Sequence, residues 1–214
     1  MKKIYPESGI ELNPVIARHY DWIMNFVSMG KYRGFIEKAI KDIDVGPADL
    51  ILDLGCGTGR NALLMADDLI SGNITGMDVS PDMEKQFRKK AEKEPKLKFI
   101  RNRIDQPFDL GKQFDKVLIS FVIHGLPHEI RQTVIRNAYA HLKPGGSFYI
   151  LDYAEFDMAE MPALHRIIFK SVECRYAFEF LRHDWKDILR NHGFKSFEEH
   201  FYARDYVRLL KAST

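Results

Sequence analysis

The apolar residues of this chain alternate between short continuous runs and helical spacing. Runs of strand length occur at 50–54, 73–77, 97–101, 116–120 and 147–152. Apolar residues recur at three- and four-residue intervals over 62–70, from Ser80-Pro81 to just before Pro95, and over 127–141. This alternation predicts parallel strands that are joined by helices.

The two ends of the chain extend this pattern. Apolar positions between 14 and 43 predict two helices, which form an N-terminal helical cap over 1–47. A helix at 185–191 and strands at 197–202 and 206–210 predict a C-terminal unit over 183–214, with its strands paired in antiparallel fashion. We therefore expect a single α/β domain over 1–214, with a doubly wound, mostly parallel sheet and an antiparallel strand near one edge.

Composition and charge narrow the function classes. The 214 residues include 32 Lys and Arg against 30 Asp and Glu, a net charge of +2 that argues against a partner nucleic acid. No apolar run approaches the roughly 20 residues that span a bilayer, and the N-terminus lacks the apolar stretch of a secretory signal. We expect a cytoplasmic protein without stable membrane insertion, whose Cys56 and Cys174 are free thiols.

A glycine-rich turn follows the first predicted strand. Gly55, Gly57 and Gly59 alternate with other residues, which lets the backbone approach a ligand closely. A dinucleotide fingerprint would need its third glycine where Arg60 stands. Asp53, just before the turn, would repel a pyrophosphate but attract an ammonium group. The turn therefore predicts a ligand that carries a cation.

A second acid completes this ligand site. Asp78 comes at the end of the second predicted strand, where a carboxylate can accept hydrogen bonds from both hydroxyls of a ribose. An ammonium site at Asp53 beside a ribose site at Asp78 describes S-adenosylmethionine better than NAD, FAD or ATP.

These motifs resemble the class I S-adenosylmethionine-dependent methyltransferases, whose acid-x-Gly-x-Gly-x-Gly pattern matches 53–59. Segments 76–80, 114–120 and 142–146 are similar to the family in order and spacing, so the resemblance covers about 48–153, the cofactor-binding core. It implies a Rossmann-like, seven-stranded sheet, S-adenosylmethionine as cofactor and S-adenosylhomocysteine as product. Segment 17–21 is weakly similar to ubiquinone/menaquinone biosynthesis methyltransferases, whereas 121–126 resembles the general small-molecule group.

The resemblance implies a cofactor site along the carboxyl ends of the strands. The expected cofactor-binding residues are Tyr20, Asp53, Gly55, Cys56, Gly57, Thr58, Gly59, Asp78, Val79, Met83, Arg103, Ile104, Asp105 and Ser120. Arg103 stands where many relatives carry an acid for the adenine amino group, and Asp105 is the alternative. Ser120 is expected to offer its backbone carbonyl.

Two residues are candidates for catalysis. His124 follows the fourth predicted strand, near the transferable methyl, and an ordinary histidine pKa of about 6.5 suits a general base. Tyr20 could cover the sulfonium cation with its ring. The alternatives are a histidine that packs the cleft wall and a core tyrosine. We expect no metal, because His19, His165, His183 and Cys174 lack paired short spacings.

The apolar segment 154–182 is interpreted as a substrate lid, with ordinary core or a homodimer contact as the alternatives. The sequence thus predicts an enzyme that transfers a methyl group, by in-line displacement, to a small apolar or aromatic metabolite, including quinone-like acceptors. Two alternatives stay open: an RNA or protein methyltransferase, and a non-catalytic cofactor-binding protein of the same fold.

Overall fold

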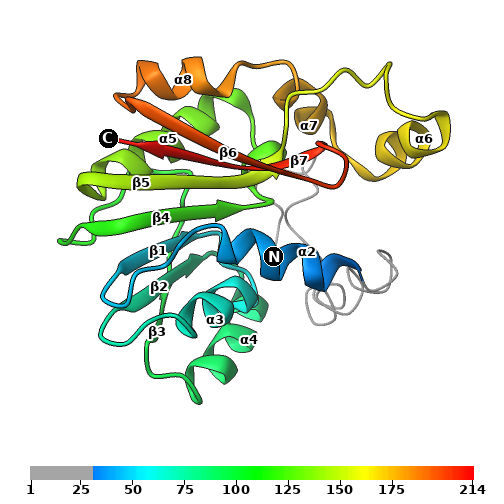
Figure 1. The fold of residues 1–214 in the computed structure, drawn as a ribbon. Helices are drawn as coiled ribbons and strands as arrows, with labels where there is room; N and C mark the ends of the chain where they lie inside the picture. The colour runs from blue at the N-terminus through cyan, green and yellow to red at the C-terminus, as the bar shows by residue number, and fades with distance from the viewer. Residues whose placement is uncertain (1–30) are drawn as a thin grey trace.

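The computed structural model describes residues 31–214 (Figure 1). The first expected helix, the 17–21 segment and Tyr20 therefore lie outside the described residues. Among residues 31–214, no helix is long and apolar enough to cross a membrane. Cys56 and Cys174 are both free thiols, as expected.

Seven strands form one sheet, which confirms the predicted fold class. The strands are β1 (Leu50–Leu54), β2 (Asn73–Asp78), β3 (Leu97–Arg101), β4 (Phe114–Ser120), β5 (Leu142–Tyr153), β6 (Ser196–Tyr202) and β7 (Val207–Ser213). Their order is β3-β2-β1-β4-β5-β7-β6. The pairs among β1 to β5 are parallel, and β7 runs antiparallel to both β5 and β6. The reversal of order beside β1 is where such sheets place ligands.

Helices cover both faces of this sheet (Figure 1). They are α2 (Lys31–Lys41), α3 (Arg60–Ala66), α4 (Pro81–Ala91), the 3-10 turn η1 (Ile123–Gly125), α5 (His128–Ala140), α6 (Ala163–Val172), α7 (Arg175–Phe180) and α8 (Trp185–Asn191). Buried residues of α2, α3 and α4 form a core on one face, whereas those of α5, α7 and α8 form a core on the other. Alternate side chains of each central strand enter the two cores.

Helix starts follow from local sequence chemistry. The Ser80 hydroxyl accepts a hydrogen bond from the Met83 backbone N–H at 3.4 Å, and Pro81 opens α4, as the sequence predicts. The Asp184 side chain caps α8 in the same way, through the Asp187 N–H at 2.9 Å. These caps fix where the helices begin relative to the strand ends.

The fifth strand begins earlier than the sequence indicates. The turn expected at 143–146 is an irregularity inside β5, because Phe114 pairs with Leu142 while Lys116 already pairs with Ser147. Gly145, with φ of 79°, lets the backbone make this detour. The ammonium group of Lys143 then binds the Asp115 carboxylate at 2.8 Å.

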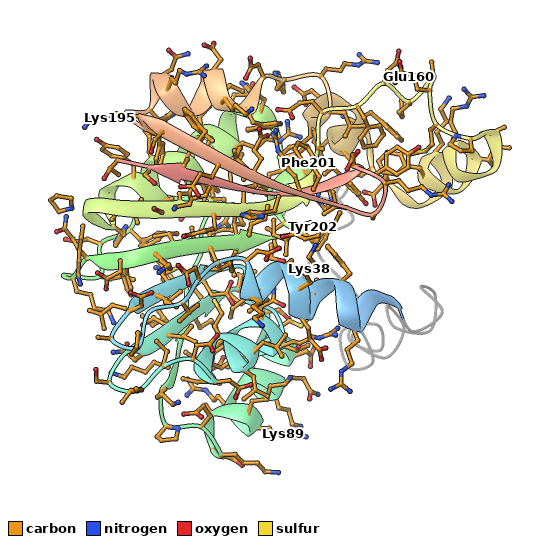
Figure 2. All side chains as sticks on the ribbon, in the orientation of Figure 1. Lys38, Lys89, Glu160, Lys195, Phe201 and Tyr202 are labelled. Atoms are coloured by element: carbon orange, nitrogen blue, oxygen red, sulfur yellow. The ribbon has the colours of Figure 1, made fainter. Side chains whose placement is uncertain are left out.

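Helix α2 and the residue that follows it contact the far edge of the sheet. The Tyr202 hydroxyl of β6 donates to Asp42 Oδ2 at 2.6 Å. Figure 2 shows Lys38 of α2 beside the Tyr202 ring, with its Nζ 5.5 Å from the ring centroid. These contacts hold the end of α2 against strands that come last in the sequence.

The segment expected to be a lid consists of two different parts. Ala177 and Phe180 of α7 are buried, and Phe180 belongs to the same core as α5 and α8. α6 lies farther out, beyond the carboxyl ends of the strands (Figure 1). The α7 half of the segment is thus ordinary core, and the lid role of the remainder stays a prediction.

Candidate active site

The glycine turn between β1 and α3 has the backbone shape that its sequence requires. Gly55, Gly57 and Gly59 have φ values of 69°, 52° and 76°, in the left-handed region that favours glycine. The Gly55 N–H donates to the Met77 carbonyl at 2.8 Å, which holds the turn against β2. A Cβ at Gly55 would lie 2.8 Å from Val122 Cγ2, so the turn also touches the loop after β4.

The other two glycines differ in what surrounds them. A Cβ at Gly59 would lie 2.4 Å from the Phe87 ring, so this position is closed by packing. A Cβ at Gly57 would meet only Met83 Sδ, at 4.0 Å. Gly57 therefore borders open space, where a ligand can approach the backbone.

Asp53 holds a buried carboxylate with an unsatisfied oxygen. The residue is 1% exposed, and Oδ2 has no hydrogen-bond partner among the described residues. Burial, and then the charge of Asp78, raise the pKa of Asp53 to about 7. A ligand ammonium group would satisfy the oxygen and restore the charged form, so the residue fits the cation that the sequence predicts.

Asp78 is anchored by the turn. Its Oδ2 accepts the Gly57 N–H at 3.0 Å and its Oδ1 accepts the Ser80 N–H at 2.8 Å. Burial raises the pKa of Asp78, although the hydrogen bonds from Ser80 and Gly57 oppose this shift. Each carboxylate oxygen keeps a second lone pair, which is what two ribose hydroxyls need.

Cys56, Thr58, Val79 and Met83 lie beside these acids. Cys56 is buried, and burial together with the charges of Asp53 and Asp78 raises the pKa of its thiol, so it is no nucleophile. The Thr58 carbonyl accepts a hydrogen bond from Lys90 Nζ at 2.7 Å. The structure thus gathers this part of the expected cofactor set in one place, although its contacts to a cofactor stay predictions.

His124 is held by an acid at the end of the neighbouring strand. Its Nδ1 lies 2.7 Å from Asp152 Oδ1, and its backbone N–H donates to Asp152 Oδ2 at 3.3 Å. Burial alone would lower the pKa of His124, but the carboxylates of Asp152 and then Glu173 raise it above its ordinary value. This pairing fixes the ring orientation and leaves Nε2 directed away from Asp152.

Glu173 and two aromatic rings complete the surroundings of His124. Glu173 Oε2 lies 3.6 Å from His124 Nε2, and Glu173 Oε1 accepts the Tyr153 hydroxyl at 2.6 Å. The His124 ring centroid lies 5.0 Å from that of Tyr153 and 6.5 Å from that of Phe180. The His124 imidazole, which can accept a proton, is therefore packed between aromatic rings.

A comparison with known protein families matches the part of the chain that contains the glycine turn and Asp78. A methyltransferase domain family matches residues 51–146, from β1 to the irregular start of β5. Over these residues the chain is similar to methyltransferase domains. The matched residues include the acid-and-glycine turn and Asp78.

Several relatives bear methyltransferase names. A demethylmenaquinone methyltransferase of Lactobacillus johnsonii is 32% identical over 157 residues, covering 70% of this chain and 63% of the relative. The chain thus spans less than two thirds of that enzyme. An uncharacterized methyltransferase of Synechocystis is 25% identical, with 90% and 92% covered. The crystal structure of a SAM-dependent methyltransferase from Aquifex aeolicus shares the fold, with a TM-score of 0.67, 14% identity, and coverage of 95% and 99%.

The residues that are expected to border the adenine form contacts with neighbouring side chains. Arg103 binds Asp105 through two contacts, Nε to Oδ1 at 2.9 Å and Nη2 to Oδ2 at 2.6 Å. The Ile104 carbonyl accepts the Asn137 side-chain amide at 2.9 Å. The two residues that were alternatives in the sequence are thus partners, and an adenine contact from Asp105 would have to share its oxygens with Arg103.

Ser120 ends β4 directly before the loop that carries Val122 and His124. The Phe121 N–H donates to the Leu151 carbonyl of β5 at 2.9 Å, and Phe121 has φ of 52°. This left-handed residue turns the chain sharply after the strand, which brings Val122 against Gly55. The Ser120 carbonyl lies at the right strand end for the expected contact, which stays a prediction.

Asp152 and Glu173 are the site residues that the sequence analysis missed. Asp152 ends a predicted strand at the same sheet edge as His124, and that position is a signal that could have identified it. Glu173 lies between α6 and α7, far from His124 in sequence, and no spacing rule connects the two.

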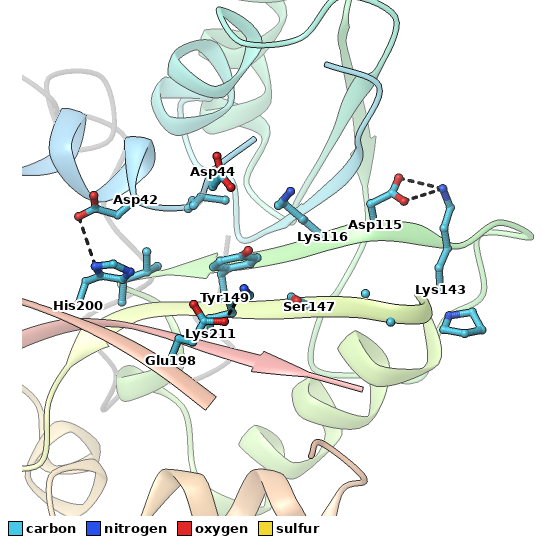
Figure 3. Close-up of a pocket in the computed structure, with 15 residues that line it drawn as sticks. Asp42, Asp44, Asp115, Lys116, Lys143, Ser147, Tyr149, Glu198, His200 and Lys211 are labelled. Carbon is cyan, nitrogen blue, oxygen red and sulfur yellow. Dashed lines mark hydrogen bonds and ion pairs between the residues drawn. The ribbon is translucent and has the colours of Figure 1, made fainter. Parts of the chain in front are cut away.

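A separate hollow of about 470 Å³ lies at the opposite, amino ends of β4 and β5 (Figure 3). Most of its charged groups pair with one another: Lys143 with Asp115 at 2.8 Å, Lys211 with Glu198 at 2.7 Å, and His200 with Asp42 at 3.9 Å. Asp115 also accepts the Leu50 N–H, so it is a structural residue. The hollow is not part of the cofactor site.

Proposed function

We propose that this protein transfers the methyl group of S-adenosylmethionine to a small hydroxylated aromatic metabolite of the quinol type. The observation that carries the proposal is His124, oriented by Asp152 and walled by Tyr153 and Phe180, on a loop that contacts the glycine turn through Val122 and Gly55. The likeness to a protein named demethylmenaquinone methyltransferase supports the same acceptor class.

The donor side is a matter of binding and orientation. S-adenosylmethionine supplies an activated methyl group on a sulfonium centre when bound. Asp53 accepts hydrogen bonds from the ligand ammonium group, Asp78 accepts them from the ribose hydroxyls, and Gly57 leaves room for the ligand beside the backbone. Holding donor and acceptor in line is the largest contribution that this chain can make to the rate.

His124 acts as the base in this proposal. Its Nδ1–H donates to Asp152, which leaves the lone pair on Nε2 to remove a proton from the acceptor hydroxyl. The electron pair that stays on the acceptor oxygen makes the acceptor more nucleophilic. Glu173, 3.6 Å from Nε2, stabilises the resulting imidazolium.

Aromatic side chains surround the proposed binding site of the methyl acceptor. Ring contacts with centroid distances of 4.9 to 5.9 Å link Tyr153 to Phe169, Phe169 to both Phe156 and Phe178, and Phe156 to Tyr206. These rings come from the end of β5, from α6 and α7, and from the turn before β7. They form an apolar surface that suits a flat ring and, with α6 as a lid, excludes water.

The test supplies methyl-labelled S-adenosylmethionine and a protein-depleted cell extract, with a reduced naphthoquinone in a parallel reaction. We expect label in the organic-soluble fraction and in the naphthoquinol product, identified by its mass. The variant His124→Gln should lose at least about 100-fold in rate while S-adenosylhomocysteine affinity is kept.

The control variant is His192→Gln, which changes a partly buried histidine at the end of α8. It should react at the normal rate. Label that enters only aqueous small molecules would overturn the quinol class, and label that enters macromolecules would identify an RNA or protein substrate instead. Binding of S-adenosylhomocysteine with no label in any fraction would overturn the enzymatic function.

A further inference from the structure

We propose that this protein has a second site, outside the proposed methyl-transfer site, which binds a divalent transition-metal ion of the zinc class through His128, Glu179 and His183. One ligand atom from each of the three side chains lies within 4.8 Å of the other two. His128 is the first residue of α5, Glu179 lies in α7, and His183 lies between α7 and α8. Glu179 and His183 are four residues apart, but His128 lies about 51 residues before them, so no short spacing connects the three along the chain. The proposal departs from the expectation of no metal.

Two unsatisfied ring nitrogens point to a ligand. His128 Nδ1 and His183 Nε2 are both shielded from solvent and have no hydrogen-bond partner among the described residues. Shielded polar atoms are nearly always paired, because an unpaired one has lost its hydrogen bonds to water without replacing them. A metal ion coordinated by both nitrogens would satisfy them together.

The two histidine rings are already brought together. Their centroids lie 4.2 Å apart with an interplanar angle of 28°, so the rings are stacked. A neutral imidazole is the form that binds a metal ion.

Glu179 supplies the third ligand. Its Oε1 lies 3.7 Å from His183 Nε2, on the side of the ring pair, whereas its Oε2 lies 3.9 Å from Arg131 Nη1. One carboxylate oxygen is therefore available to an ion while Arg131 positions the other. Such a contact behind a metal ligand is common and fixes its orientation.

The side chain of Gln132 contacts His128. Its side-chain amide lies 3.1 Å from His128 Nε2. The amide atom at this distance is Gln132 Nε2, which donates to His128 Nε2, so the proton of the neutral ring lies on Nδ1, the unsatisfied atom. Coordination through Nδ1 therefore moves the proton to Nε2 and turns the Gln132 amide by a half rotation, so that its oxygen accepts from Nε2–H.

The ligand set defines the class of ion. Two imidazoles and one carboxylate suit zinc and neighbouring late first-row ions, and three protein ligands leave a position for water. Ca²⁺ and Mg²⁺, which prefer oxygen ligands, should bind weakly. The positive charge of Arg131 opposes the ion, so we expect micromolar rather than nanomolar affinity.

The site would fasten α7 to the start of α5. Arg131, which contacts Glu179, also donates from Nη2 to the Tyr176 carbonyl at 2.6 Å and to the His124 carbonyl at 2.9 Å. A bound ion would therefore stabilise the helix that carries Phe180, on the acceptor side of the cleft. Its main effect would be on the stability of this segment, which is measurable without any methyl acceptor.

The test uses the full chain after chelator treatment and dialysis. Zn²⁺ is titrated by calorimetry, and Co²⁺ by its visible absorption, which is strong when the ion is tetrahedral. We expect one ion per chain, a melting temperature that rises with Zn²⁺, and at least tenfold weaker binding in His183→Ala and in the shape-conserving Glu179→Gln. Mg²⁺ serves as the ion that should not bind.

The matched control is His200→Ala, because His200 is an exposed histidine that also faces a carboxylate, Asp42 at 3.9 Å. Its Zn²⁺ affinity should equal that of the unchanged protein, and S-adenosylhomocysteine binding reports that every variant is folded. If the unchanged protein binds no Zn²⁺ up to millimolar concentration, or if folded His183→Ala and Glu179→Gln bind as tightly as His200→Ala, the proposal is wrong. None of these readouts depends on the methyl-transfer proposal.

Discussion

At the scale of single residues, the Asp53 carboxylate of the candidate cofactor site destabilises the ligand-free protein. Its carboxylate is buried, one oxygen is unsatisfied among the described residues, and its pKa is raised to about 7. Because the pKa of Asp53 is raised in the folded state, its contribution to the free energy of unfolding is fully present below the unfolded pKa of about 4. This contribution is lost as the pH rises through about 7. Above about pH 7 the Asp53 carboxylate therefore lowers the stability of the ligand-free protein.

Asp53→Asn should therefore stabilise the ligand-free protein at pH 8, by up to about 4 kcal/mol, and this advantage should shrink towards pH 5. The same substitution should weaken S-adenosylhomocysteine binding at least about tenfold, because the ammonium group loses its counter-charge. Thermal melts at the two pH values and calorimetry of ligand binding check both parts. Equal melting differences at pH 5 and pH 8 would show that Asp53 is not the titrating group.

The Asp152 carboxylate raises the pKa of His124, so its removal should lower that pKa. Because the carboxylates of Asp152 and Glu173 raise the pKa of His124, kcat/KM should increase with pH through a pKa above about 6.5. Asp152→Asn should move this acid limb to lower pH and reduce kcat by roughly 100-fold. The measurement is the pH profile of methyl transfer, with Asp187→Asn, an exposed carboxylate on α8, as control. An unmoved acid limb in Asp152→Asn would remove His124 from the base role.

At the scale of elements, two glycine substitutions distinguish the effect of backbone strain on stability from the effect of an added side chain on ligand binding. Gly57→Ala and Gly111→Ala both place a side chain at a positive φ, 52° and 62°, and neither added Cβ meets an atom closer than 4.0 Å. Each should cost about 1–2 kcal/mol in the free energy of unfolding, for the same steric reason. Only Gly57→Ala should weaken S-adenosylhomocysteine binding, by tenfold or more, because its methyl enters the ligand space. Equal affinities, measured by calorimetry, would mean that Gly57 does not border the ligand.

Sequence reasoning captured the elements whose causes are local. The runs that became β1 to β4, the Ser80-Pro81 helix start and the acid-and-glycine turn depend on neighbouring residues, and the structure has them where the pattern places them. The irregular start of β5 was missed, since it follows from its register against β4. The Asp152 partner of His124, the Glu173 contact and the His128 cluster depend on α5, α7 and β5 meeting in space, and no spacing along the chain encodes that meeting.

At the scale of the whole molecule, the two cores share the same strands. Ile51 of β1 enters one core and Leu52 the other, and Leu118 and Val117 of β4 divide in the same way. Arg208 of β7, nearly buried, binds Glu155 after β5 and Glu199 of β6, each at 2.6 Å, so the edge strands are fastened to the centre. Unfolding one face would expose the other side of every shared strand.

We therefore predict that heat unfolds the protein in one cooperative transition, with equal calorimetric and van't Hoff enthalpies. S-adenosylhomocysteine at about 100 times its dissociation constant should add about 2.7 kcal/mol and raise the melting temperature of the whole transition by about 5–10 °C. Scanning calorimetry with and without the ligand measures this, and Asp78→Ala, which loses the proposed ribose contact, should show a much smaller shift. Two transitions, of which the ligand moves only one, would mean that the cofactor-binding core folds independently of the remainder of the chain.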